Sequence, residues 1–186
     1  MRQVSTFASA LALVSIVAGN TYAQDFAAKL NAPRVNLVSN VTNWQNTLQF
    51  GRLMQTSTHF RSLISSNARF TVFAVENDTL ASNGLPIDVV DRIVGRREKP
   101  LADRIVGAHI LRGIITSSVI SAQITRGEGT ATFMTISGIM LTATRENGKI
   151  ILTSPNGQRV QISSANHMSQ NGIVHVVDGV LDYPTR

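Results

Sequence analysis

The chain has 186 residues, of which 43% are hydrophobic and 15% are charged, and its formal net charge is +6 at pH 7. These values are typical of one globular domain that buries a sizeable core. Cysteine is absent, which excludes disulfides, thiolate catalysis and cysteine-based zinc sites. The basic charge is compatible with acidic partners, but no basic stripe with interleaved aromatic residues occurs, so we expect no nucleic acid to bind.

The first 23 residues have the pattern of a secretory signal peptide. Arg2 gives a short basic start, residues 7–18 form an apolar run, and small residues stand at positions 21 and 23. We predict cleavage after Ala23, a linker at 24–34 and one domain at 35–183. No apolar run is long enough to span a bilayer. We therefore expect a protein that is secreted, periplasmic or at the cell surface and does not span the membrane.

The first half of the domain is predicted to be mainly helical. Thr42 and Gln45 have the spacing of a capping box, which predicts a helix with Trp44 in the core. A short helix is expected at 59–65, and the aromatic and β-branched run at 70–75 predicts a strand. Further helices are predicted to open at 76–80, to begin at Pro86, and to begin at Pro100 and end at Gly107.

The residues from 117 onward have a β-rich pattern. Short runs rich in Ile, Val and Thr are separated by glycine-containing turns at hairpin distances. These runs lie at 119–124, 130–136, 139–144, 149–153 and 159–162. They predict an antiparallel meander, and helices followed by strands indicate an α+β domain.

The stretch 171–181 reads NGIVHVVDGVL and predicts the central strand of the fold. Asn171 and Gly172 form a turn dipeptide, and the residues after them are apolar at both odd and even positions. A strand with this pattern is buried on both faces. We therefore predict that this C-terminal strand inserts between elements formed earlier in the chain.

Two stretches resemble the signatures of the fasciclin domain family. Residues 70–74, FTVFA, are similar to the first signature, F-T-V-F-A-P-T-x-x-A-F, and residues 171–181 to the second, N-G-V-V-H-V-I-D-x-V-L. Residues 108–113 resemble the family's Y-H-V-V-x-G segment. The resemblance covers about residues 35–183. It implies a wedge-shaped α+β domain, with N-terminal helices packed on a bent antiparallel β-sandwich and the two signatures on neighbouring inner strands.

The resemblance also implies secretion and a non-catalytic role in adhesion or matrix interaction, with no cofactor. The partner would be a cell-surface or matrix protein or a polysaccharide. The possible interaction segment comprises Ala108, His109, Ile110 and Leu111. Ala108 stands where the family has the tyrosine of a Tyr-His pair that is associated with receptor binding, so an integrin-type role is not carried over.

The histidines form no recognisable metal or catalytic motif. His167 and His175 lie eight positions apart without a third ligand, and His-Glu-x-x-His, Gly-x-Ser-x-Gly and Walker patterns are absent. His175 shares a strand face with Ile173 and Val177, which predicts a buried, hydrogen-bonded imidazole. A hydrolase that pairs His109 or His175 with a carboxylate is a further hypothesis, but no such pair is singled out.

Two further features of the sequence bear on function. A basic envelope protein that binds anionic polysaccharide by charge is the alternative to adhesion, and its candidate residues are Arg92, Arg96, Arg97, Lys99 and Arg104. Acidic residues are interspersed among them. Asn40 and Asn77 match glycosylation acceptors, which matter only in a eukaryotic secretory pathway. The oligomeric state is not predicted.

Overall fold

The computed structural model describes residues 35–64, 67–83 and 85–182, which belong to one compact unit. The predicted signal peptide, its cleavage at Ala23 and the linker at 24–34 lie outside the described residues. The helices are α2 (Leu37–Asn43), the 3₁₀ helix η1 (Gln45–Thr47), α3 (Leu48–Thr56), α4 (Phe60–Ile64), α5 (Asn77–Ser82), α6 (Ile87–Gly95), α7 (Lys99–Ala108) and α8 (Ser117–Arg126). The strands are β1 (Phe70–Val75), β2 (Ile110–Arg112), β3 (Thr130–Met134), β4 (Met140–Glu146), β5 (Lys149–Thr153), β6 (Arg159–Ser169) and β7 (Gly172–Val177).

The strands form a single mixed sheet in the order β2-β1-β7-β6-β5-β4-β3. The last strand therefore lies between β1 and β6, which confirms its predicted insertion. β1 and β7 run parallel from Phe70↔Gly172 to Val75↔Val177, and the other neighbouring strands are antiparallel. The predicted purely antiparallel sheet is wrong at this pair, because the long connection between β1 and β7 allows the chain to return in the same direction.

The two edges of the sheet meet at one end. An isolated antiparallel bridge pairs Leu111 of β2 with Thr135, the residue that follows β3, and the Ile136 N–H donates to the Ile110 carbonyl at 2.9 Å. The sheet is therefore nearly closed upon itself. This arrangement is consistent with the predicted α+β class, but it is one curved sheet and not two separate ones.

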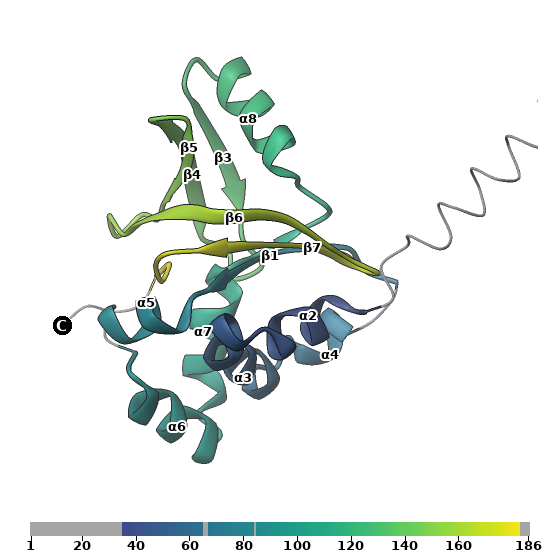
Figure 1. Cartoon of the computed structure of the whole chain (residues 1–186), viewed down its shortest axis with the longest axis vertical. Coiled ribbons are helices and arrows are strands. Elements are labelled where there is room, and N and C mark those ends of the chain that lie inside the picture. The colour runs from purple at the N-terminus through teal and green to yellow at the C-terminus, as the bar shows by residue number, and fades with distance from the viewer. Residues whose placement is uncertain (1–34, 65–66, 84, 183–186) are drawn as a thin grey trace, which may run out of the picture. The chain divides into compact units, whose positions relative to one another are not determined.

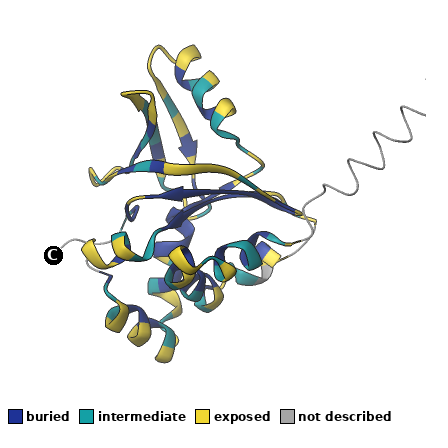
Figure 2. Cartoon of the chain, in the orientation of Figure 1, coloured by how far each residue is buried: buried dark blue, intermediate teal, exposed yellow. Residues whose placement is uncertain are grey.

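The helices pack on two parts of the sheet. α2 to α7 gather beside β1 and β7, whereas α8 lies against β3 and β4 (Figure 1). All six residues of β1 and all six of β7 are buried, as Figure 2 shows by their uniform dark blue. The pair is thus covered on both faces, as the unbroken apolar patterns predict.

The first helical region differs from the prediction. Thr42 lies inside α2, whose N-cap is Asn36, and the Asn36 carboxamide accepts the Ser39 N–H at 2.9 Å. Trp44 is half-buried at the junction of α2 and η1, and it packs at the edge of the core. The capping box at Thr42 and Gln45 is therefore wrong, because Thr42 belongs to α2, which Asn36 caps, whereas Gln45 begins the separate helix η1.

The run at 119–124 is helical and not a strand. Within α8, Ile120 and Ile124 are buried one turn apart, and the Thr116 hydroxyl accepts the Val119 N–H at 3.2 Å. The packing of this face on β3 and β4 outweighs the β propensity of the branched residues. Two other boundaries also differ: α7 continues through Gly107 to Ala108, and β6 extends to Ser169.

Candidate functional site

His175 lies in the middle of β7 and has both ring nitrogens engaged. Its Nε2 lies 2.9 Å from the Ile115 carbonyl, and its Nδ1 accepts the Asn166 N–H at 3.3 Å. The ring stacks on Phe73 of β1 with centroids 5.7 Å apart. Burial lowers the pKa of His175, and the hydrogen bond to the Ile115 carbonyl opposes that shift. The predicted buried, hydrogen-bonded imidazole is confirmed.

His109 follows α7 and is fully buried. Its Nδ1 lies 2.6 Å from the Ile105 carbonyl, its Nε2 accepts the Leu181 N–H at 2.9 Å, and its ring meets the edge of Phe50. Burial lowers the pKa of His109 to about 4, although its hydrogen bonds to backbone oppose the shift. The imidazole is held neutral with both nitrogens occupied, so it is not a free general base in this structure.

The interaction segment named from the sequence lies in the core. The side chains of Ala108, His109, Ile110 and Leu111 are each at most 1% exposed. They connect the end of α7 to β2, which pairs with β1. A partner reaches these side chains only if this part of the fold opens. The segment as it stands offers almost no side-chain surface to a partner, and its role in an interaction stays a prediction.

The carboxylates do not complete a catalytic or metal-binding group in the described residues. No three His, Asp or Glu side chains gather there in a geometry that could hold a metal ion. Every buried side-chain nitrogen or oxygen in this part of the chain has a hydrogen-bond partner. Asp178 is engaged as well, because its Oδ1 accepts the Gln161 N–H at 2.6 Å.

The two possible glycosylation acceptors hold elements of the fold together. The Asn40 Nδ2 donates to the Ser169 hydroxyl at 2.7 Å and thereby joins α2 to β6. The Asn77 Nδ2 donates to the Gln45 carbonyl at 2.5 Å, and its Oδ1 accepts the Gln49 N–H at 3.0 Å. A glycan on either nitrogen would compete with these bonds, so the structure gives both residues a structural role.

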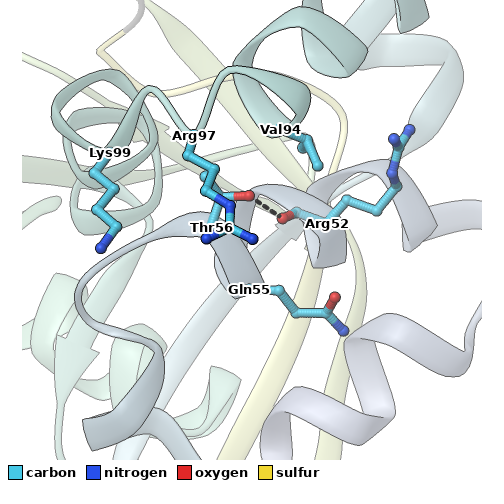
Figure 3. Close-up of a pocket in the computed structure, with 6 residues that line it drawn as sticks. All are labelled: Arg52, Gln55, Thr56, Val94, Arg97 and Lys99. Atoms are coloured by element: carbon cyan, nitrogen blue, oxygen red, sulfur yellow. Dashed lines mark hydrogen bonds between the residues drawn. The ribbon is translucent and has the colours of Figure 1, made fainter.

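The basic residues named from the sequence divide into three groups. Arg104 forms an ion pair with Asp182 at 3.2 Å. Arg97 and Lys99 line an open pocket of about 430 Å³ between α3 and the turn that joins α6 to α7 (Figure 3). The other two candidates, Arg92 and Arg96, are exposed and do not line it.

The wall of this pocket on α3 was not predicted from the sequence. It consists of Arg52, Gln55 and Thr56, and Val94 of α6 completes the lining. The Arg52 guanidinium pairs with Asp91 at 2.5 Å, so it is neutralised by the neighbouring helix. Arg52 is about 45 positions from Lys99, and no local pattern connects them. Only the packing of α3 beside α6 and α7 brings these residues together.

A second pocket of about 420 Å³ lies where the two edges of the sheet approach each other. Its apolar lining includes Leu111, Ile115, Phe133 and Met134, and Met134 is 56% exposed. The nearly closed sheet thus leaves a hollow with a mixed polar and apolar lining beside the bridge between β2 and β3. None of the helices in the described ranges is long and apolar enough to cross a membrane.

Comparisons with known proteins identify the family to which this fold belongs. The family model of the fasciclin domain matches residues 45–184, and both signature strands lie inside that range. The chain belongs to the fasciclin domain family. The two family signatures of this fasciclin domain lie on β1 and β7, the parallel pair inside its sheet between β2 and β6, as the resemblance implies.

Two curated relatives and one solved structure illustrate the range of this likeness. The chain is 30% identical over 118 residues to protein sll1483 of Synechocystis sp., which covers 63% of this chain and 57% of that protein. It is 27% identical over 148 residues to the transforming growth factor-beta-induced protein ig-h3 of Oryctolagus cuniculus, which covers 78% of this chain and 19% of that protein. The chain thus spans only part of the curated relatives that it matches.

The solved structure is a FAS1 domain pair from the insect cell adhesion molecule fasciclin I. The TM-score is 0.66 at 14% identity, over 81% of this chain and 52% of that chain. At this identity the likeness shows a shared fold. The family match and the shared fold therefore agree that this chain is a fasciclin domain.

Proposed function

We propose that this fasciclin domain is an exported, non-catalytic adhesion module that mediates contact between a cell and another cell or the matrix. The observation that supports this most directly is the family match over residues 45–184, together with the fold shared with an insect cell adhesion molecule. The predicted signal peptide at residues 1–23 supports export. The partner is a cell-surface or matrix protein or a polysaccharide.

The state of the two core histidines supports the non-catalytic part of the proposal. His109 and His175 are both held by backbone groups and have lowered pKa values, and each packs against a phenylalanine ring. These contacts fix the sheet and the helix layer to one another. The histidines thus serve the stability of the domain, and a hydrolase that uses them gains no support from their geometry.

The alternative function, charge-driven binding to an anionic polysaccharide of the envelope, is favoured by a specific observation. Within the described residues, the cations Arg97 and Lys99 form no ion pair, and they share a pocket whose lining contains no carboxylate. Binding that depends on diffuse charge weakens steeply as salt screens it, whereas binding to a shaped surface persists. Salt dependence therefore separates the two functions.

The test is binding of the purified chain to intact cells and to extracted extracellular material at low and high salt. Saturable binding that persists at high salt is expected for an adhesion module. A basic globular protein of similar size and unrelated fold serves as the charge control, and the variant His175→Asp as the fold control. Binding that is lost at high salt would favour the charge-driven alternative, and binding equal to that of the charge control would refute the adhesion proposal.

A further inference from the structure

We propose that the pocket between α3 and the α6–α7 turn binds a carboxylate group of an acidic polysaccharide, with Arg97 and Lys99 as the residues that hold it. The inference rests on the proposed adhesion function, since it names the chemistry of the partner. It assigns that chemistry to a defined site and not to the net charge of the molecule.

The size of the pocket fits part of a sugar chain. Its volume of about 430 Å³ falls within the range of about 300–1,000 Å³ that is usual for small-ligand sites. It is more than ten times the share of one water molecule in the liquid, about 30 Å³. A lone ion would leave most of this space to solvent, whereas a sugar ring that carries a carboxylate would occupy much more of it.

The charges around the pocket leave two cations available. Arg52 donates to the Gln49 carboxamide at 2.9 Å and pairs with Asp91, and its guanidinium turns away from Arg97 (Figure 3). The Arg97 side chain extends toward Thr56 on α3. Within the described part of the chain, neither Arg97 nor Lys99 has a side-chain hydrogen bond or ion pair, and the lining contains no acidic residue.

The backbone of Arg97 has a conformation that does not suit an arginine. Its φ is 51°, the Glu98 N–H donates to the Ile93 carbonyl at 2.9 Å, and the Arg97 N–H donates to the Val94 carbonyl at 3.2 Å. These two bonds form a Schellman motif in which Arg97 occupies the left-handed position that usually holds glycine. An arginine here costs stability relative to glycine, and strain of this kind is concentrated at functional sites.

Lys99 also stands at an unfavourable place. It is the first residue of α7, the first turn of that helix contains no acidic residue, and its N-cap Glu98 makes no side-chain capping bond. A cation is disfavoured at a helix N-terminus because the helix dipole is positive there. Arg97 and Lys99 therefore both occupy backbone positions that disfavour them, and both line the same pocket. Such local conflicts are expected where a sequence is selected for binding and not for stability alone.

The side chains that line the pocket suit a carboxylate group attached to an otherwise uncharged sugar ring. The planar guanidinium of Arg97 can donate two parallel hydrogen bonds to one carboxylate, and the Lys99 ammonium adds a mobile point charge. The exposed carboxamide of Gln55 offers a donor and an acceptor to sugar hydroxyls, and Val94 provides an apolar wall. This combination of charged, polar and apolar groups suits a uronic acid unit.

The test is calorimetric titration of the purified chain with an oligogalacturonate trimer, and with maltotriose as the neutral control. We expect the trimer to bind and maltotriose not to bind. Arg97→Gly is the decisive variant, because glycine suits the left-handed position. It should keep or raise the melting temperature while it weakens trimer binding by about tenfold, the loss expected for a charged hydrogen bond. Lys99→Gln should weaken binding in the same direction.

Arg92→Ala is the matched control, since it removes one exposed positive charge on α6 outside the pocket. It should change the affinity by less than about twofold at physiological salt. Equal losses in Arg92→Ala and Arg97→Gly would overturn the site, because net charge alone would then explain binding. Binding of inorganic phosphate with the same dependence on Arg97, without binding of the trimer, would also overturn it.

If the chain binds extracted surface material but not the trimer, the inference fails and the adhesion function stands; if it binds neither, both fail.

Discussion

The backbone N–H of Leu181 donates a hydrogen bond of 2.9 Å to Nε2 of His109, a residue 72 positions earlier in the chain. The other ring nitrogen, Nδ1, is bonded to the Ile105 carbonyl within α7. The imidazole thus links the end of α7 to the segment that follows β7. It can do so only in the neutral form, because Nε2 must accept a hydrogen bond while the Nδ1–H donates one.

We predict that the protein loses stability as the pH falls from about 6.5 to about 4. The pKa of His109 is lowered from 6.5 to about 4 in the folded protein. The unfolded chain therefore binds a proton at this residue before the folded chain does, and acidification favours unfolding. The expected loss is about 3 kcal/mol. His175 contributes with the same sign, because its pKa is also lowered. Urea unfolding at pH 7.0, 5.5 and 4.5 measures the effect.

The control for the pH prediction is His109→Gln, in which no imidazole titrates at this position. This variant should be less stable than the wild type at pH 7, since the glutamine cannot make both bonds in the same geometry. Its further loss between pH 7 and 4.5 should be smaller than that of the wild type. Equal pH dependence in the two proteins would contradict the assignment of the effect to His109.

A charge in place of His175 should disrupt the domain. The variant His175→Asp places a carboxylate against the Ile115 carbonyl and the face of Phe73, at a position that is fully buried. We expect a loss of about 3 kcal/mol or more, measured by thermal or urea unfolding. His167→Asp is the matched control, because His167 is partly exposed on β6. A normal unfolding curve for His175→Asp would refute the burial of β7.

The strands β1 and β7 could be predicted because the apolar pattern that identifies each one lies within the strand itself. The strands at 70–75 and 172–177 have unbroken apolar sequences, and a strand buried on both faces needs neighbours on both sides. That reasoning places the last strand inside the sheet. It does not give the direction of the β1–β7 pair, because the apolar pattern of a fully buried strand reads the same in both directions.

The errors occur where tertiary packing decides between local alternatives. Val119 and Ile120 are β-branched, so the run at 119–124 resembles a strand, but Ile120 and Ile124 need the helical spacing to reach β3 and β4. The pocket between α3 and the α6–α7 turn has the same origin. Arg97 and Lys99 were recognised as basic residues, but their position opposite Gln55 and Thr56 depends on how three helices pack.

Gly172 should not tolerate a side chain, whereas Gly95 should. A Cβ at Gly172 would overlap the Phe70 carbonyl of the paired strand and lie 2.6 Å from Cδ1 of Leu37. Gly172→Ala should therefore lower the free energy of unfolding by about 1–3 kcal/mol. A Cβ at Gly95, at the end of α6, meets nothing within 4 Å, and Gly95→Ala should raise stability by about 0.5–1 kcal/mol because alanine is the better helix former. Changes of the same sign in the two variants would contradict this reading of the β1–β7 pair.

The carboxamide of Asn171 connects two helices to the start of β7. Its Oδ1 accepts the Leu37 N–H at 2.9 Å, and its Nδ2 donates to the Leu63 carbonyl at 2.6 Å. Asn171→Ala leaves both buried backbone groups without these bonds and should cost about 2–4 kcal/mol in a urea unfolding experiment.

The variant Asn171→Asp separates the contribution of the bond to Leu37 from that of the bond to Leu63. The carboxylate still accepts from Leu37 at the N-terminus of α2, but it faces the Leu63 carbonyl with no proton to donate. At pH 7 this variant should therefore be markedly less stable than the wild type. Burial against a carbonyl raises the pKa of such an aspartate, so the protonated form is favoured in the folded state. The deficit relative to the wild type at the same pH should then shrink as the pH falls toward 4. A deficit that grows or stays constant on acidification would show that the lost donor bond to Leu63 does not limit stability.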